Sequence, residues 1–164
     1  MNLQSEGIIT MTKNNEVTKL LTKNNEALLS TSFLLLRCVA GIVLFMVGAG
    51  KVFGWFGGYG MAATIKGYSQ MGFSTPLAYV SSYTEFIGGL LFTTGFLTRP
   101  AAIAVIINMV VATIVMLPHG FLGPSGASYP FAFLIISISI LISGPMSFSI
   151  DSRIFQKQKQ DFGK

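Results

Sequence analysis

The chain is poor in the residues that build metal and redox centres. Its 164 residues include one cysteine, Cys38, and one histidine, His119. A single cysteine forms neither an intramolecular disulfide nor a CxxC redox pair. One Cys and one His also fall short of the ligand sets of a structural zinc site, an iron–sulfur cluster or a bis-His haem. We therefore expect no metal and no redox cofactor held by this chain alone.

Charge is also scarce. Only 10% of the residues are charged and 51% are hydrophobic, with a mean hydropathy of +0.64, whereas soluble domains carry about 25% charged residues. A water-soluble globule cannot hide this much apolar surface. We expect an all-α integral membrane protein with the lipid bilayer as its main partner, and its length leaves no room for a separate soluble enzyme domain.

Four apolar stretches predict transmembrane helices. Each is about 20 residues long and covers roughly 30 Å as a helix, which matches the hydrocarbon core of a bilayer. They are residues 27–50, 78–97, 100–118 and 127–150. The sequence thus predicts a bundle of four antiparallel transmembrane helices within residues 27–150. Thr98 and Arg99 alone form the predicted turn between the second and third spans. Gly144 and Pro145 are expected to bend the last helix or end it early.

The connecting and flanking segments are polar or mixed. Residues 51–77 place Met61, Ile65 and Tyr68 on one helical face, so they form either a short helix on the membrane surface or an ordinary ordered loop. Residues 1–26 repeat the motif TKNNE and predict a disordered or frayed helical arm. Residues 151–164 form a basic tail. Met11 is an alternative start to Met1.

Basic residues are distributed unevenly around the predicted spans. If the N-terminus is cytoplasmic, only Lys51 and Lys66 lie on the outer side, and all other basic residues near the spans lie inside. The positive-inside rule then places both termini in the cytoplasm, with the spans crossing the cytoplasmic membrane. The basic residues are scattered without interleaved aromatics, so we expect no nucleic-acid binding.

Only Arg37 and Glu85 are charged residues within the predicted spans. A charge at membrane depth costs roughly 2.5–3.5 kcal/mol even on lenient scales, so it normally persists only when paired or functional. Counted from the span ends, the two lie roughly 15 and 10 Å deep from opposite faces. Antiparallel neighbouring helices would bring them within reach of each other, and Arg can then bind the carboxylate through two hydrogen bonds. We predict this buried pair as the centre of the site.

The predicted pair has three interpretations. Gly41 and Gly89 follow the two charges at i+4 and allow close helix packing, so the pair either locks two helices together or lines a polar pocket; the third is chance placement without contact. Candidate pocket neighbours are Tyr83, Thr84, Thr93 and Asn108, of which Tyr83 and Asn108 are the candidates for cofactor binding. His119 is either a polar loop residue or a proton-handling group at the outer surface.

Three sequence blocks stand out in chain order: RCVAGIVLFMVGAGKVFGWFGG, EFIGGLLFTTGFLTRPAA and YPFAFLIISISILISGPMSFSID. Together they resemble the DoxX family of small bacterial four-helix membrane proteins. The resemblance covers roughly residues 33–151 and rests on these residues: Arg37, Gly41, Gly48, Lys51, Phe53, Gly54, Glu85, Gly88, Gly89, Gly95, Thr98 and Arg99. The chain departs from the family pattern at Val47, where many members have His, and at Ser128, where many have an acidic residue.

The resemblance implies a link to membrane redox chemistry. Some DoxX-like proteins are associated with thiosulfate:quinone oxidoreductase in archaea, or with superoxide dismutase and a sulfurtransferase in actinobacteria. We expect a subunit or accessory of a quinone-linked membrane redox system, in which a quinone or a redox partner protein carries the electrons. The alternative is a non-enzymatic membrane scaffold or a small-solute permeability factor. Gly-rich helix faces are compatible with a homo-oligomer without requiring one.

Overall fold

The secondary structure of the described residues is entirely helical. The computed structural model describes residues 3–123, 125–144 and 149–151. In chain order the elements are α1 (Leu3–Phe53), the 3₁₀ turn η1 (Trp55–Gly57), α2 (Gly60–Gln70), α3 (Thr75–Thr94), α4 (Thr98–Met116), the 3₁₀ turn η2 (Leu117–His119) and α5 (Ser128–Ser143). The all-α class predicted from composition is confirmed for this part of the chain.

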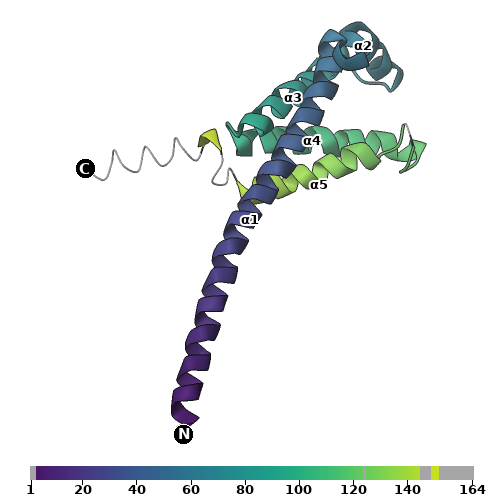
Figure 1. Ribbon diagram of the computed structural model, residues 1–164. Coiled ribbons are helices and arrows are strands. Elements are labelled where there is room, and N and C mark those ends of the chain that lie inside the picture. Colours follow the sequence, from purple (N-terminus) through teal and green to yellow (C-terminus); the bar gives the residue numbers. More distant parts are fainter. Residues whose placement is uncertain (1–2, 124, 145–148, 152–164) are drawn as a thin grey trace.

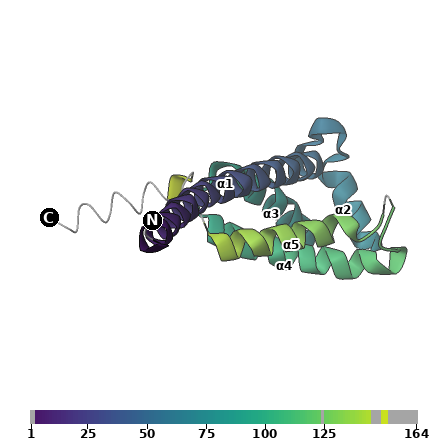
Figure 2. The same ribbon diagram turned by 60° about the horizontal axis from the view of Figure 1, so that its bottom comes forward.

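The helices form two closely packed pairs. α1 packs most extensively against α3, and α4 packs most extensively against α5. Figure 1 shows α4 and α5 side by side, with α1 crossing them obliquely and its first half projecting away from the other helices. Figure 2 shows α2 at the far end of this assembly, where α1 ends. α2 contacts both α1 and α3, so it closes one end of the helix assembly.

Two helical segments are long and apolar enough to cross a membrane. They are Leu28–Phe53, which is the second half of α1, and Thr98–His119, which comprises α4 and η2. The apolar α5 is shorter. Many large apolar side chains on these helices face outward, among them Ile107, Ile114 and Ile142, which are 62%, 66% and 76% exposed.

Glycines mark where two of the helices, α3 and α5, end. α3 ends at Thr94 because Gly95 adopts a left-handed conformation with φ 68°. Gly144, with φ 69°, follows the last residue of α5, so the predicted early end of the last helix is confirmed. The prediction that Thr98 and Arg99 form the turn between the middle spans is wrong. Residues 95–97 make this turn, and Thr98 already begins α4.

Two other segments refine the sequence-based expectations. α1 begins at Leu3 and continues without interruption into the first predicted span, so the N-terminal arm is helical. The predicted short helix within residues 51–77 is present as α2. Its Ile65 and Tyr68 are partly buried and its Lys66 and Gln70 are exposed, as the amphipathic pattern indicates.

Small residues allow α1 and α3 to approach closely. A side chain at Gly48 would overlap the backbone of Phe86, and one at Gly89 would overlap the backbone of Phe45. These contacts also show that the two helices run antiparallel, because Gly48 faces Phe86, whereas the earlier Gly41 faces the later Thr93. Larger side chains fill the space between this pair and the α4 and α5 pair, including the fully buried Leu44, Phe92, Val105 and Met109.

Candidate functional site

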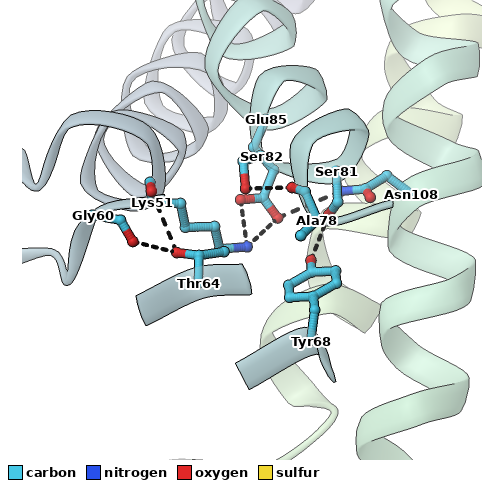
Figure 3. Close-up of polar contacts among 9 residues, drawn as sticks. All are labelled: Lys51, Gly60, Thr64, Tyr68, Ala78, Ser81, Ser82, Glu85 and Asn108. Carbon is cyan, nitrogen blue, oxygen red and sulfur yellow. Dashed lines mark hydrogen bonds and ion pairs between the residues drawn. The ribbon is translucent and has the colours of Figure 1, made fainter. Parts of the chain in front are cut away.

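A buried carboxylate on α3 forms an ion pair with the last turn of α1. Glu85 is 3% exposed. Lys51 Nζ donates a hydrogen bond to Glu85 Oε1 at 2.8 Å and lies 2.6 Å from Oε2. The Lys51 side chain is 29% exposed, so the cation is partly exposed while the carboxylate is buried. Figure 3 shows the Lys51 side chain directed at the Glu85 carboxylate. A cation in the last turn of a helix also interacts favourably with the helix dipole.

Asn108 and α2 complete the surroundings of this ion pair. Asn108 on α4 directs its Nδ2 toward Glu85 Oε1 at 3.4 Å, a long hydrogen bond. Two hydroxyl groups of α2 form hydrogen bonds that hold this helix beside the site (Figure 3). The Thr64 hydroxyl donates to the Lys51 carbonyl at 3.3 Å, and the Tyr68 hydroxyl makes a 2.6 Å hydrogen bond with the Ser81 hydroxyl. Three helices thus supply the polar groups, and a fourth flanks them.

One carboxylate oxygen and one nearby hydroxyl remain without directed hydrogen bonds. Glu85 Oε2 forms an ion pair with the Lys51 ammonium at 2.6 Å, and no other described residue donates a hydrogen bond to it. The buried Tyr129 hydroxyl on α5 also has no partner among the described residues. It lies close enough to the Glu85 carboxylate to interact with it electrostatically.

The predicted ion pair between Arg37 and Glu85 is wrong. The Arg37 guanidinium lies against Gly95, at the end of α3, whereas Glu85 faces Gly48 and Lys51. Glu85 and Gly95 are ten positions apart, which is roughly 15 Å along a helix. The prediction failed because it counted depth from residue 27. The first residue of α1 described as buried is Arg37 itself, so α1 enters the helix assembly about ten residues later than expected.

Arg37 belongs to a second polar cluster, at the opposite end of the α1 and α3 pair. It is 5% exposed and interacts electrostatically with Asp151. The Asp151 carboxylate accepts hydrogen bonds from the backbone N–H groups of Leu97 and Thr98, at 2.9 and 3.0 Å, and from the Thr98 hydroxyl at 3.0 Å. An acid from the distant C-terminal segment thus caps the N-terminus of α4.

The other predicted site residues are dispersed. Asn108 does reach Glu85, as expected for a pocket neighbour. Tyr83 is 40% exposed and, being two positions from Glu85, points to another side of α3. Thr93 instead donates to the Gly89 carbonyl and lines the contact with Gly41. His119 is exposed at the end of η2.

Lys51, Tyr129 and Asp151 are the functional candidates that the sequence-based search missed. Lys51 was assigned to the outer loop because it follows the predicted span by one residue. The signal for it was its position three residues after Gly48, since a long Lys stem can reach back along a helix to a buried acid. Tyr129 and Asp151 gave no local signal because only tertiary contacts bring them to these clusters.

The site around Glu85 combines an acceptor with several donors. Lys carries three N–H groups and Asn carries two, so each retains donors beyond those directed at Glu85. The arrangement can therefore bind a ligand oxygen beside the Glu85 carboxylate. Among the described residues, no group of three or more His, Cys, Asp or Glu side chains is arranged to hold a metal ion.

Comparisons with known proteins identify the family. The sequence profile named DoxX matches residues 32–118. A relative from Bacillus subtilis (strain 168), named "Putative oxidoreductase CatD", is 31% identical over 127 residues, which cover 77% of this chain and 89% of the relative. No solved structure matches the chain at a significant level. The profile match includes Arg37, Lys51, Glu85 and Asn108. The chain therefore belongs to the DoxX family.

Proposed function

We propose that this protein is an integral membrane subunit or accessory of a quinone-linked redox system in the bacterial cytoplasmic membrane. The observation that carries the proposal is the buried Glu85 with its partners Lys51 and Asn108. Burying charged and polar side chains among apolar helices costs free energy, so a cluster of this kind typically marks a functional site. The name of the relative, an oxidoreductase, supports the redox part of the proposal.

The proposed membrane arrangement uses α1, α3, α4 and α5 as four antiparallel spans. Support comes from the outward-facing apolar side chains, since exposed isoleucines on α4 and α5 suit contact with acyl chains better than contact with water. The positive-inside rule places both termini in the cytoplasm. In this orientation Lys51 and Glu85 lie toward the outer side, and Arg37 and Asp151 lie toward the cytoplasm.

The residues of the Glu85 site fit the headgroup of a quinone. The carbonyl oxygens of a quinone are hydrogen-bond acceptors, and Lys51 and Asn108 supply donors from two different helices. A bound quinone would supply the capacity to carry two electrons and two protons. Lys51 would orient a carbonyl oxygen, and Glu85 would hold or release a proton beside it. The Lys51 side chain is partly exposed, so its ammonium group is accessible to a ligand.

The test compares quinone-dependent electron transfer by the wild-type protein and by Glu85→Gln. The protein is isolated in mild detergent with its bound partners and assayed with a short-chain quinone. We expect Glu85→Gln to lose the activity or the bound quinone while remaining folded, because its amide replaces the proton-carrying carboxylate. Glu26→Gln, in the N-terminal arm, is the matched control. Equal activity in wild type and Glu85→Gln would refute the proposed role of this site.

The alternative is a membrane scaffold without catalytic activity, and one observation favours it. Lys51 already neutralises Glu85, so the pair by itself explains why the acid persists at this position. A stable protein that binds no quinone but recruits partner proteins equally well with and without Glu85 would support the scaffold. The close contact of α1 with α3 gives no particular support to the small-solute permeability role.

A further inference from the structure

We propose that residues 53–59, the anchor segment, insert into the interfacial region of the lipid leaflet at the outer end of α1. The partner is the lipid surface itself, at the level where headgroups meet acyl chains. The inference rests on the proposed membrane arrangement but not on a redox activity. It deepens the proposed function, because it fixes the depth in the membrane at which Lys51 and Glu85 lie.

The anchor segment is rich in exposed aromatic rings and carries no charge. Trp55, Phe56 and Tyr59 are each more than half exposed. The sequence has no charged residue between Lys51 and Lys66. Trp and Tyr join a polar group to an apolar ring, and both are enriched where a membrane meets water. A lipid interface therefore fits this patch better than bulk water.

The chain reverses direction within the anchor segment and folds back along α1. Gly54 and Gly57 adopt left-handed conformations, with φ 75° and φ 81°, which allow a sharp turn. Gly58 then packs against Gly50, and a side chain at Gly58 would overlap the backbone of Gly50. Gly50 lies in the last turn of α1. The turn therefore returns the segment to the side of the apolar helix instead of extending it into water.

A row of ring contacts joins the anchor segment to the α1 and α3 pair. Trp55 stacks on Phe53, the last residue of α1, with ring centroids 4.8 Å apart. Phe53 in turn meets Phe86 of α3 edge to face, with centroids 5.4 Å apart. These contacts hold Trp55 at the level of the last turn of α1. Insertion of the segment would thus fix the depth of the turn that carries Lys51.

The backbone of Phe56 supports an external partner for its ring. Phe56 has φ 55° and ψ 30°, a left-handed conformation that bulky residues rarely adopt. Such strain persists where the surroundings of the residue favour it. The described chain nevertheless leaves Phe56 61% exposed, so contacts within the protein bury little of it. Acyl chains around the ring would bury the remainder.

The experiment measures the fluorescence of Trp55, which is the only tryptophan of the chain. The purified wild-type protein is reconstituted in liposomes of phosphatidylcholine brominated near either the glycerol end or the methyl end of its acyl chains. Bromine quenches tryptophan on contact. We expect roughly two-fold stronger quenching by bromine near the glycerol end, because Trp favours the interface. Acrylamide dissolved in the water should quench Trp55 weakly.

Two variants provide the comparison. Trp55→Phe combined with Lys66→Trp moves the tryptophan to the exposed face of α2, where acrylamide should quench it and brominated lipid should not. Gly58→Ala displaces the anchor segment from Gly50 and should lower the quenching of Trp55 by lipid by roughly half. Gly67→Ala is its matched control, since nothing lies within 4 Å of the added methyl group.

Carbonate extraction of the liposomes separates failure of the anchor from failure of the membrane arrangement. Protein that carbonate removes would refute both. In protein that stays in the membrane, strong quenching of Trp55 by acrylamide without quenching by lipid would overturn the anchor alone. Protection from every quencher would also overturn it, because a second copy of the chain would then cover the rings. Quenching strongest at the methyl end would contradict an interfacial depth.

The wild-type measurement decides the proposal even if Gly58→Ala does not fold. If that variant folds and its quenching is unchanged, the contact with Gly50 does not place the anchor segment, which would contradict the argument from the reversed chain. A protein without quinone-dependent activity would still show the expected quenching of Trp55, so the anchor and the redox role fail separately.

Discussion

At the scale of single residues, the two buried charges belong to different clusters. Glu85 is neutralised by Lys51, and Arg37 lies near Asp151. That Glu85 would need a cation was predictable from its position in an apolar segment. The identity of the cation was not, because the relative depth of two helices depends on where each enters the helix assembly. Lys51 was a less obvious partner than Arg37 because it lies one residue beyond the predicted span.

A double-mutant cycle tests this reassignment of partners. Lys51→Met and Glu85→Gln should each destabilise the protein, and the double variant should lose less than the sum, with a coupling of about 0.5–3 kcal/mol. The partial exposure of Lys51 favours the lower part of this range. Thermal unfolding in detergent provides the measurement. Arg37→Gln combined with Glu85→Gln is the control, and its effects should add because the two sites lie at opposite ends of the helix pair.

At the scale of elements, glycine positions set the spacing of α1 and α3. We predict that Gly89→Ala destabilises the protein by about 1–3 kcal/mol, because the added methyl group overlaps the backbone of Phe45. Gly67→Ala on α2 is the matched control. Nothing lies within 4 Å of its added methyl group, so its stability should stay equal or rise slightly. Equal melting temperatures for the two variants would contradict the close helix contact.

The N-terminus of α4 depends on a residue from the other end of the chain. Asp151→Ala removes three hydrogen bonds to Leu97 and Thr98 and should cost about 0.5–2 kcal/mol, the usual value of a helix N-cap. Asp151→Asn should cost less because its side-chain oxygen still accepts a hydrogen bond. Amide hydrogen exchange at residues 97–100 should accelerate most in Asp151→Ala. Unchanged exchange there would argue against the capping role.

Helix existence was more predictable than helix ends. Apolar length and composition indicated four long helices, and the amphipathic pattern of Ile65 and Lys66 indicated α2. The end of α3 at Gly95 was missed because Phe96 and Leu97 are as apolar as the helix before them, and hydropathy does not register a left-handed glycine. The capping role of Asp151 was not predictable from the sequence pattern, because a cap that lies 53 residues from the helix it caps is visible only in the folded chain.

At the scale of the whole molecule, the proposed topology assigns each connection to one side of the membrane. We predict that a cysteine introduced at Lys66 in a Cys38→Ser background reacts with a membrane-impermeant maleimide on intact cells. A cysteine at Arg99 should react only after permeabilisation, because Arg99 begins α4 on the proposed cytoplasmic side. Both positions are exposed in the folded chain. Labelling of both sites on intact cells would contradict the arrangement of α3 as a membrane span.

The central claim is that a quinone headgroup binds beside Glu85, between α1, α3 and α4. Photolabelling with an azido-quinone in nanodiscs, followed by mass spectrometry of the labelled peptides, tests this claim most directly. The account predicts labels on the peptides that contain Lys51, Glu85 or Asn108, and their loss when unmodified quinone competes. Labels confined to the end of the molecule that contains Arg37 and Asp151, or labels that unmodified quinone does not displace, would contradict it.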